Sequence, residues 1–269
     1  MAILIPKMFQ GENQDGHVQS PYQSIFEASE TQKYILGARY EMADGRVFRY
    51  AKAGAVALVQ ARMMQSGVTP TAYYDDIAQT AYPRTVGDID IRVLVATGSV
   101  AAAGIGAGEN DFSGGWLVCN KTSPAVLGDI YGIVASKHYS ETLLDLKLVT
   151  PWRNAMLATG EITLTVSKYF ETTVFAAYDA TAPAIGVPLC PVPINYYYWS
   201  QVKGPCPILV DGSEAPDIGQ MIGCPITLAT PGNCGQQIVT TAEVLRRPWG
   251  ICMGVSEADE PTLVDLMLE

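Results

Sequence analysis

Residue types that carry acid–base or nucleophilic chemistry are scarce in this 269-residue chain, which contains two histidines, His17 and His138. A serine or cysteine nucleophile needs a neighbouring base, most often histidine, to take its proton. No Gly-x-Ser-x-Gly turn occurs in the sequence. We interpret His138, which precedes Tyr139, as a surface or half-buried histidine and predict no catalytic residue. A hydrolase that uses His138 as its base is the alternative.

Two acidic pairs match the residue types of a general acid–base site. Asp88 and Asp90 are two residues apart and would share one face of a strand, and Asp75 adjoins Asp76. Acidic residues at this spacing are also common on the exposed face of an acidic protein. We therefore interpret both pairs as surface charge.

The glycine-rich stretch Gly104–Gly108 has backbone N–H groups that could cradle a phosphate. It lacks a third glycine at the required spacing and a following Lys-Ser/Thr pair, and Glu109 and Asp111 would repel an anion. We interpret the stretch as a loop, so the sequence predicts no cofactor site.

The six cysteines offer no metal-binding spacing, because none are closer together than Cys224 and Cys234. We predict no metal site and expect buried, reduced thiols. A disulfide cluster within Cys206–Cys252 is the alternative.

The composition restricts the class of partner. The formal charge is −10 and 48% of residues are hydrophobic, with 16% charged. Nucleic-acid binding needs clustered positive charge, and binding to an anionic membrane needs a basic amphipathic segment. The sequence shows neither of these, nor an apolar run long enough to span a bilayer or a secretory leader. We expect no nucleic-acid, membrane or small-molecule partner, and synthesis in a cytoplasm.

Alternating apolar and polar residues predict antiparallel strands, and Asp44-Gly45 predicts a hairpin turn between Arg39–Met42 and Arg46–Tyr50. We also interpret the ambiguous Ala53–Met64 as a strand. The other predicted strands are Ile89–Val93, Leu144–Leu148, Ile162–Ser167 and Leu263–Leu268.

One segment predicts a short helix, because Thr69-Pro70 forms a helix start and apolar residues follow at helical spacing until Pro83. The fold class is therefore mainly β, an antiparallel sandwich or barrel-like domain with an extended N-terminal arm and one short helix. We place the arm at residues 1–34 and the β-domain at residues 35–269, with a subdivision near residues 101–108.

Two segments are candidate interfaces. The arm is polar and aperiodic, so it is either mobile or lies on a partner, and its apolar tip favours a partner. On a strand, the aromatic run Tyr196–Trp199 would place alternate side chains on opposite faces, one pair in the core and one at a subunit contact. Glycan stacking on this run is the alternative. The predicted interface residues are Ile3, Leu4, Ile5, Met8, Phe9, Tyr196, Tyr197, Tyr198 and Trp199.

The order of several segments resembles a group of tailed-phage virion proteins that look like head decoration (cement) proteins. Together the segments span about two-thirds of the chain. The chain departs from the group after Asn120, where Lys121–Pro124 replaces a glycine-rich phrase. The segments that carry the resemblance are Leu36–Tyr40, Asp44–Lys52, Gly114–Asn120, Gly186–Pro188, Asn195–Pro207 and Val210–Gly212.

This resemblance implies a non-enzymatic protein on the outer surface of a phage capsid. It implies a homotrimer bound to the major capsid protein, which it would stabilise by bridging neighbouring subunits. A tail or fibre-base component and a carbohydrate-binding β-module are the alternatives.

Overall fold

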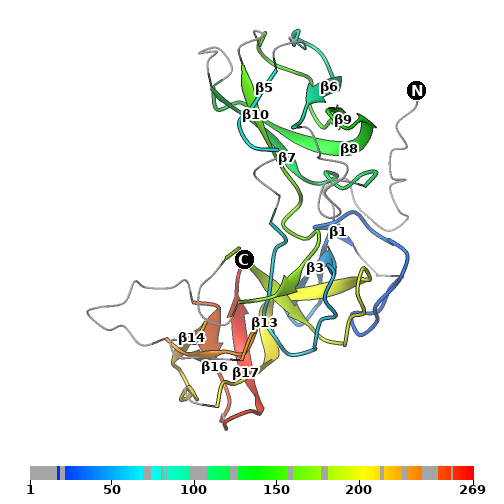
Figure 1. The fold of residues 1–269 in the computed structure, drawn as a ribbon. Coiled ribbons are helices and arrows are strands. Elements are labelled where there is room, and N and C mark those ends of the chain that lie inside the picture. The colour runs from blue at the N-terminus through cyan, green and yellow to red at the C-terminus, as the bar shows by residue number, and fades with distance from the viewer. Residues whose placement is uncertain are drawn as a thin grey trace. The chain divides into compact units, whose positions relative to one another are not determined.

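The structure is a computed structural model, and it is mainly β with antiparallel sheets, one of them a strongly curled half-barrel, as predicted (Figure 1). The chain divides into two compact units at Gly67/Val68 and at Ser167/Lys168. The predicted subdivision near residues 101–108 falls almost entirely outside the described residues. Unit 1 contains Val68–Ser167, and unit 2 contains the described residues before and after it. The described residues are 17–18, 22–68, 74–79, 82, 84–96, 108–121, 127–156, 160–176, 181–212, 215–225, 230–237, 248–255 and 257–269.

Unit 1 is a six-stranded sheet in the order β5-β10-β7-β8-β9-β6. Its inward positions are apolar and its outward positions are mostly polar, so each strand shows the period of two that the sequence predicted. The strands are β5 (Ile77–Ala78), β6 (Asp90–Leu94), β7 (Trp116–Lys121), β8 (Ile130–Ser140), β9 (Leu143–Leu148) and β10 (Glu161–Thr165).

Side chains connect the two ends of this sheet and make it a half-barrel. The buried amide of Gln79, which follows β5, accepts a hydrogen bond from Leu94 N–H at 2.8 Å and donates to Leu94 C=O at 3.1 Å in β6. The guanidinium of Arg84 donates to the carbonyls of Tyr82 and Arg92, and burial lowers the pKa of Arg84 to about 10. Unpaired backbone groups at the β6 edge are thereby satisfied.

Unit 2 contains an eleven-stranded sheet with the main order β1-β2-β3-β13-β17-β16-β14-β15, to which β4, β11 and β12 attach. The predicted hairpin is confirmed, because β2 and β3 pair through a turn in which Gly45 has φ +88°. The strands are β1 (His17–Val18), β2 (Arg39–Glu41), β3 (Val47–Lys52), β4 (Met64–Gln65), β11 (Thr173–Val174), β12 (Ala184–Pro188), β13 (Tyr197–Leu209), β14 (Met221–Gly223), β15 (Gly235–Gln236), β16 (Gly250–Cys252) and β17 (Pro261–Met267).

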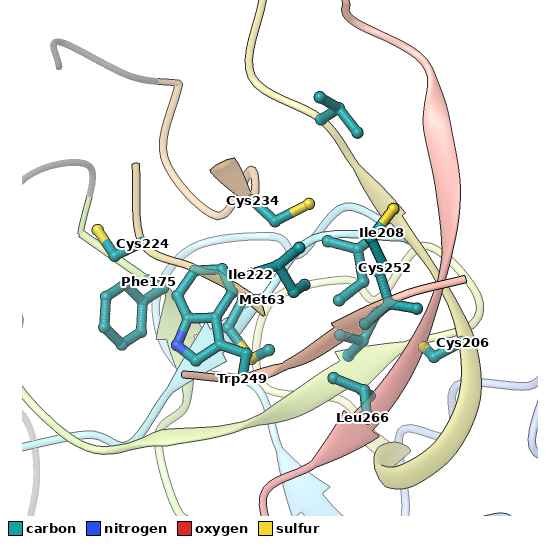
Figure 2. Packing of buried hydrophobic residues seen from close by; sticks show 13 residues of the cluster. Met63, Phe175, Cys206, Ile208, Ile222, Cys224, Cys234, Trp249, Cys252 and Leu266 are labelled. Atoms are coloured by element: carbon teal, nitrogen blue, oxygen red, sulfur yellow. The ribbon is translucent and has the colours of Figure 1, made fainter. Parts of the chain in front are cut away.

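A buried cluster of thirteen residues covers the inner face of β13, β14, β16 and β17 (Figure 2). The rings of Phe175 and Trp249 meet edge to face with centroids 5.1 Å apart, an arrangement favoured by the aromatic quadrupoles. Cys206 and Cys252 fill smaller spaces in the same cluster. This inner face is therefore closed by the chain's own side chains.

Two local predictions are wrong. The end of the predicted helix is strand, because Ile77 and Ala78 pair with β10. Tyr74 has helical conformation, and the predicted helix start at residues 69–73 lies outside the described residues. Ala53–Met64 is largely irregular, with isolated bridges from Ala53 to Thr172 and from Leu58 to Val192. In the first segment tertiary pairing with β10 outweighed local propensity, whereas the second has no ladder partner along most of its length.

Candidate interaction surfaces

Unit 2 carries an exposed apolar face on the outside of β13, β14, β16 and β17. Pairing places Met221 beside Ile251, Ile251 beside Asp265, and Asp265 beside Pro205. Paired residues point to the same side of a sheet, so these four lie on one face. We call this surface the methionine face; its apolar members are Pro205, Pro207, Met221, Ile251, Met253, Leu263 and Met267.

The side chains of the methionine face are open to solvent. Met221 is 52%, Met253 47%, Leu263 44% and Met267 42% exposed. Antiparallel sheets with one core face normally carry polar residues on the other. Contiguous exposed apolar patches mark interaction sites, and flexible methionines suit such surfaces. The methionine face is therefore a candidate docking surface.

The second half of β13 pairs with β17 on one side and has a free edge on the other, and its residues disfavour pairing with a further strand. Pro205 and Pro207 have no N–H to offer a further strand, and prolines are found on such edges. The buried side chain of Gln201 donates to the carbonyls of Lys203, Gly204 and Pro205 at 2.8–3.2 Å. Because the backbone is capped here, contact with a partner would use the side chains of the face.

One acidic side chain interrupts the methionine face. Asp265 lies between Pro205 and Ile251 across the strands and between Leu263 and Met267 along β17. It is half-buried, and its carboxylate has no hydrogen-bond or ion-pair partner among the described residues. The surface thus combines apolar contact area with one available negative charge.

Unit 1 carries a second, smaller apolar patch on the outer side of β7 and β8. Trp116 pairs with Gly132, and Val149 N–H donates to the carbonyl of Gly132 at 2.9 Å. A Cβ on Gly132 would meet the Val149 methyl at 3.0 Å and the Trp116 ring at 3.6 Å, so both side chains lie over the glycine. Trp116 and Ile130 are about half exposed and Val149 is 63% exposed. We call Trp116, Val118, Ile130 and Val149 the tryptophan face.

A polar network borders the tryptophan face on β10. Thr163 pairs with Val118 and its hydroxyl donates to Asp75 at 2.5 Å, while Asn120 donates to Thr163 at 2.7 Å and to Asp76. An apolar centre with a polar rim is the usual anatomy of a protein interface. The acidic pair Asp75 and Asp76 therefore belongs to a hydrogen-bonded rim.

The aromatic run Tyr196–Trp199 is covered on both faces, so the predicted open face is not found within this chain. Tyr198 packs with Tyr169 and Met64. Trp199 packs on the opposite face, with its ring 5.1 Å from that of Tyr50. Tyr196 and Tyr197 are half-buried, and their role at an interface stays a prediction.

The arm falls into two parts. The predicted interface residues Ile3, Leu4, Ile5, Met8 and Phe9 lie outside the described residues. Residues 22–34 pack on unit 2, where Ile25 and Tyr34 join the cluster that contains Trp199. The Trp199 indole also donates to the carbonyl of Gln23 at 3.1 Å. This second part of the predicted arm therefore contributes buried side chains to the core of unit 2.

The other candidate residues serve local structure. Asp88 accepts hydrogen bonds from the N–H and hydroxyl of Thr85 at 3.0 and 2.8 Å, and these bonds lower the pKa of Asp88. Asp90 pairs with Lys147 at 3.2 Å across β6 and β9. His138 lies in β8 and is partly exposed. Of the stretch Gly104–Gly108, only Gly108 is described, and its N–H donates to Asp111.

All six cysteines are free thiols, and five of them are buried. Burial raises the pKa of Cys119 and of Cys234 to about 12, which suppresses the reactive thiolate. Within the described part of the chain, no group of three or more His, Cys, Asp or Glu residues is placed to hold a metal ion. No described helix is long and apolar enough to cross a membrane.

One strand of the methionine face could be recognised in the sequence. Leu263–Leu268 is apolar at every position except Asp265, and such a run indicates a strand with two apolar faces. The neighbours of this strand could not be identified from the sequence, because they come from distant segments: Lys203, which pairs with Met267, lies 64 residues away along the chain.

Comparison with protein families, curated proteins and solved structures yields no match to this chain.

Proposed function

We propose that this protein is a phage head decoration protein that binds the outer surface of the capsid and stabilises it by bridging major capsid protein subunits. The observation that carries the proposal is the methionine face, an exposed apolar sheet surface on an otherwise acidic chain. The major capsid protein is proposed as the partner because the order of segments resembles head decoration proteins. The proposal includes self-association as a homotrimer.

Bridging requires at least two contact surfaces, and each unit supplies one. The methionine face lies on unit 2 and the tryptophan face on unit 1. Two modest contacts on one chain reinforce each other, because the second forms at high effective concentration. Exposed tryptophan and methionine are enriched where proteins meet. A chain of this kind can hold a lattice together without catalysing a reaction.

The negative charge of the chain suits the outer surface of a head. A formal charge of −10 disfavours contact with packaged DNA. Apolar contacts with few charges also persist at high ionic strength, since salt screens exposed ion pairs. The proposal therefore expects binding to heads that survives a wash in high salt.

Co-sedimentation with phage heads tests the proposal. Purified protein is mixed with heads that lack it, and the bound fraction is measured for wild type, Met253→Asp and the control Val86→Asp. Val86 is 67% exposed but lies on neither face. We expect wild type and Val86→Asp to bind equally and Met253→Asp to lose at least tenfold in affinity. Failure of the wild-type protein to bind heads would refute the proposal.

A further inference from the structure

The methionine face has a charge requirement that any occupant must satisfy. Asp265 has apolar neighbours on all four sides of the outer face: Pro205 and Ile251 across the strands, and Leu263 and Met267 along its own strand. A partner that covers these four residues also covers the carboxylate. Burying an ionised carboxylate without a counter-ion or hydrogen-bond donor is strongly unfavourable.

The chain itself does not neutralise Asp265. No cation of the described residues lies within ion-pair distance of it. Lys203, the nearest lysine in the register, pairs with Met267 and sits at the border of the face, diagonal to Asp265. Two carboxylates of unit 1 that lie on a sheet face do have partners: the exposed Asp90 pairs with Lys147 and the half-buried Asp145 with Arg92 at 2.6 Å. The carboxylate of Asp265 is therefore available to a basic group on another protein.

We infer that the partner of the methionine face is an apolar protein surface that carries one basic side chain, arginine or lysine, opposite Asp265. The inference rests on the proposed function, in which that surface belongs to the capsid subunit. An arginine would satisfy both carboxylate oxygens with two parallel N–H donors. The apolar residues provide contact area, and the charge pair fixes register and rejects surfaces that lack the cation.

A second copy of this chain is the less fitting occupant. Each copy carries a formal charge of −10, so a contact between copies at this face would add an unpaired carboxylate to like net charges. The proposed homotrimer would therefore use another surface. Lys203 lies at the border of the face on β13, whereas Asp265 lies near its centre on β17, the strand between β13 and β16. A cation from a different protein is free to sit over the centre of the face.

Charge substitutions test the inference on intact heads. Head affinity is measured at low and high salt for wild type, Asp265→Asn, Asp265→Lys and the control Glu30→Lys. The control changes the net charge equally, at an exposed position away from the face. We expect Asp265→Lys to lose at least tenfold in affinity and Glu30→Lys to bind as wild type. Asp265→Asn should lose severalfold and show a weaker salt dependence, and this variant decides the case if Asp265→Lys does not fold.

The outcomes separate the inference from the proposed function. If wild type binds heads and all variants bind equally, the inference is overturned while the decoration role stands. If wild type does not bind heads, both fail. Sedimentation of the free protein completes the test: if Asp265→Lys abolishes self-association but leaves head binding intact, a second copy occupies the face and the inference is overturned.

Discussion

The side chain of Gln79 replaces a strand at the edge of unit 1, since it holds both the N–H and the C=O of Leu94. Its Oε1 accepts at 2.8 Å and its Nε2 donates at 3.1 Å. A backbone residue in a neighbouring strand would make the same pair of bonds. One glutamine thus closes the half-barrel where β5 is too short to continue.

Replacing Gln79 with alanine should loosen this closure. Both hydrogen bonds would be lost at a fully buried position, at a cost of about 2 kcal/mol in the free energy of local opening. Hydrogen exchange at the Leu94 amide measures this directly, and we expect it to accelerate by about tenfold or more. The exposed-turn variant Gln220→Ala is the control, and equal exchange at Leu94 in the two variants would contradict the closing role.

The second prediction concerns Glu269, which anchors the segment after β17. Burial raises the pKa of its side chain, but hydrogen bonds from Arg49 and Tyr169 and the charges of Arg49 and Lys168 outweigh burial and lower it overall. A carboxyl with a lowered pKa stabilises the fold above its unfolded pKa, and this contribution is lost as the pH falls through the folded value.

We therefore expect Glu269→Gln to be less stable than wild type at pH 7 by about 1 kcal/mol. The difference should shrink as the pH falls below the ordinary glutamate pKa of 4.5 and should vanish only below the lowered folded value, where the wild-type carboxyl is neutral as well. Chemical denaturation at several pH values measures it, with the exposed Glu30→Gln as control. A difference that stays constant from pH 7 to pH 3 would show that the ion pair contributes nothing.

The cysteines should differ in reactivity. Cys190 is half-buried, whereas the other five thiols are buried, and burial raises the pKa of Cys190 as well. A thiol with a pKa near 12 is ionised in about one molecule in ten thousand at pH 8. We expect iodoacetamide to modify Cys190 first in the native protein, as followed by mass spectrometry of peptides. Early modification of Cys119 or Cys234 would contradict the packing described for them.

The tryptophan face should contribute to binding and not to folding. Trp116 is half exposed, so Trp116→Ala should change the free energy of unfolding by less than about 1 kcal/mol. Its loss at an interface centre would weaken head binding by at least tenfold. Tyr139→Ala, another exposed aromatic on unit 1, is the control. If both variants bind heads equally well, the tryptophan face is not a contact surface.

The parts of the fold that depend on neighbouring residues can be predicted from the sequence, and the parts that depend on contacts between distant segments cannot. The Asp44-Gly45 hairpin and the alternating strand Leu144–Leu148 follow from neighbouring residues and are confirmed. Ile77–Ala78 adopts strand structure because β10 lies beside it, which local spacing does not encode. The division into two units likewise depends on contacts between segments on either side of Val68–Ser167.

The interaction surfaces show the same limit. The aromatic run Tyr196–Trp199 is conspicuous in the sequence, yet Tyr198 and Trp199 are core residues, because clusters from distant segments cover both sides of β13. The methionine face is assembled from four separate strands. No spacing pattern links Met221, Met253 and Met267, so only the fold brings them together.

Methionine oxidation tests the central claim, that the methionine face is covered by the capsid. Free and head-bound protein are treated with dilute peroxide, and sulfoxide formation is followed by mass spectrometry for Met221, Met253 and Met267. Buried Met63 and Met64 and half-buried Met42 serve as internal references. We predict that the three exposed methionines oxidise several times more slowly on heads, while the references do not change. Equal oxidation of the three methionines in free and bound protein would contradict the account.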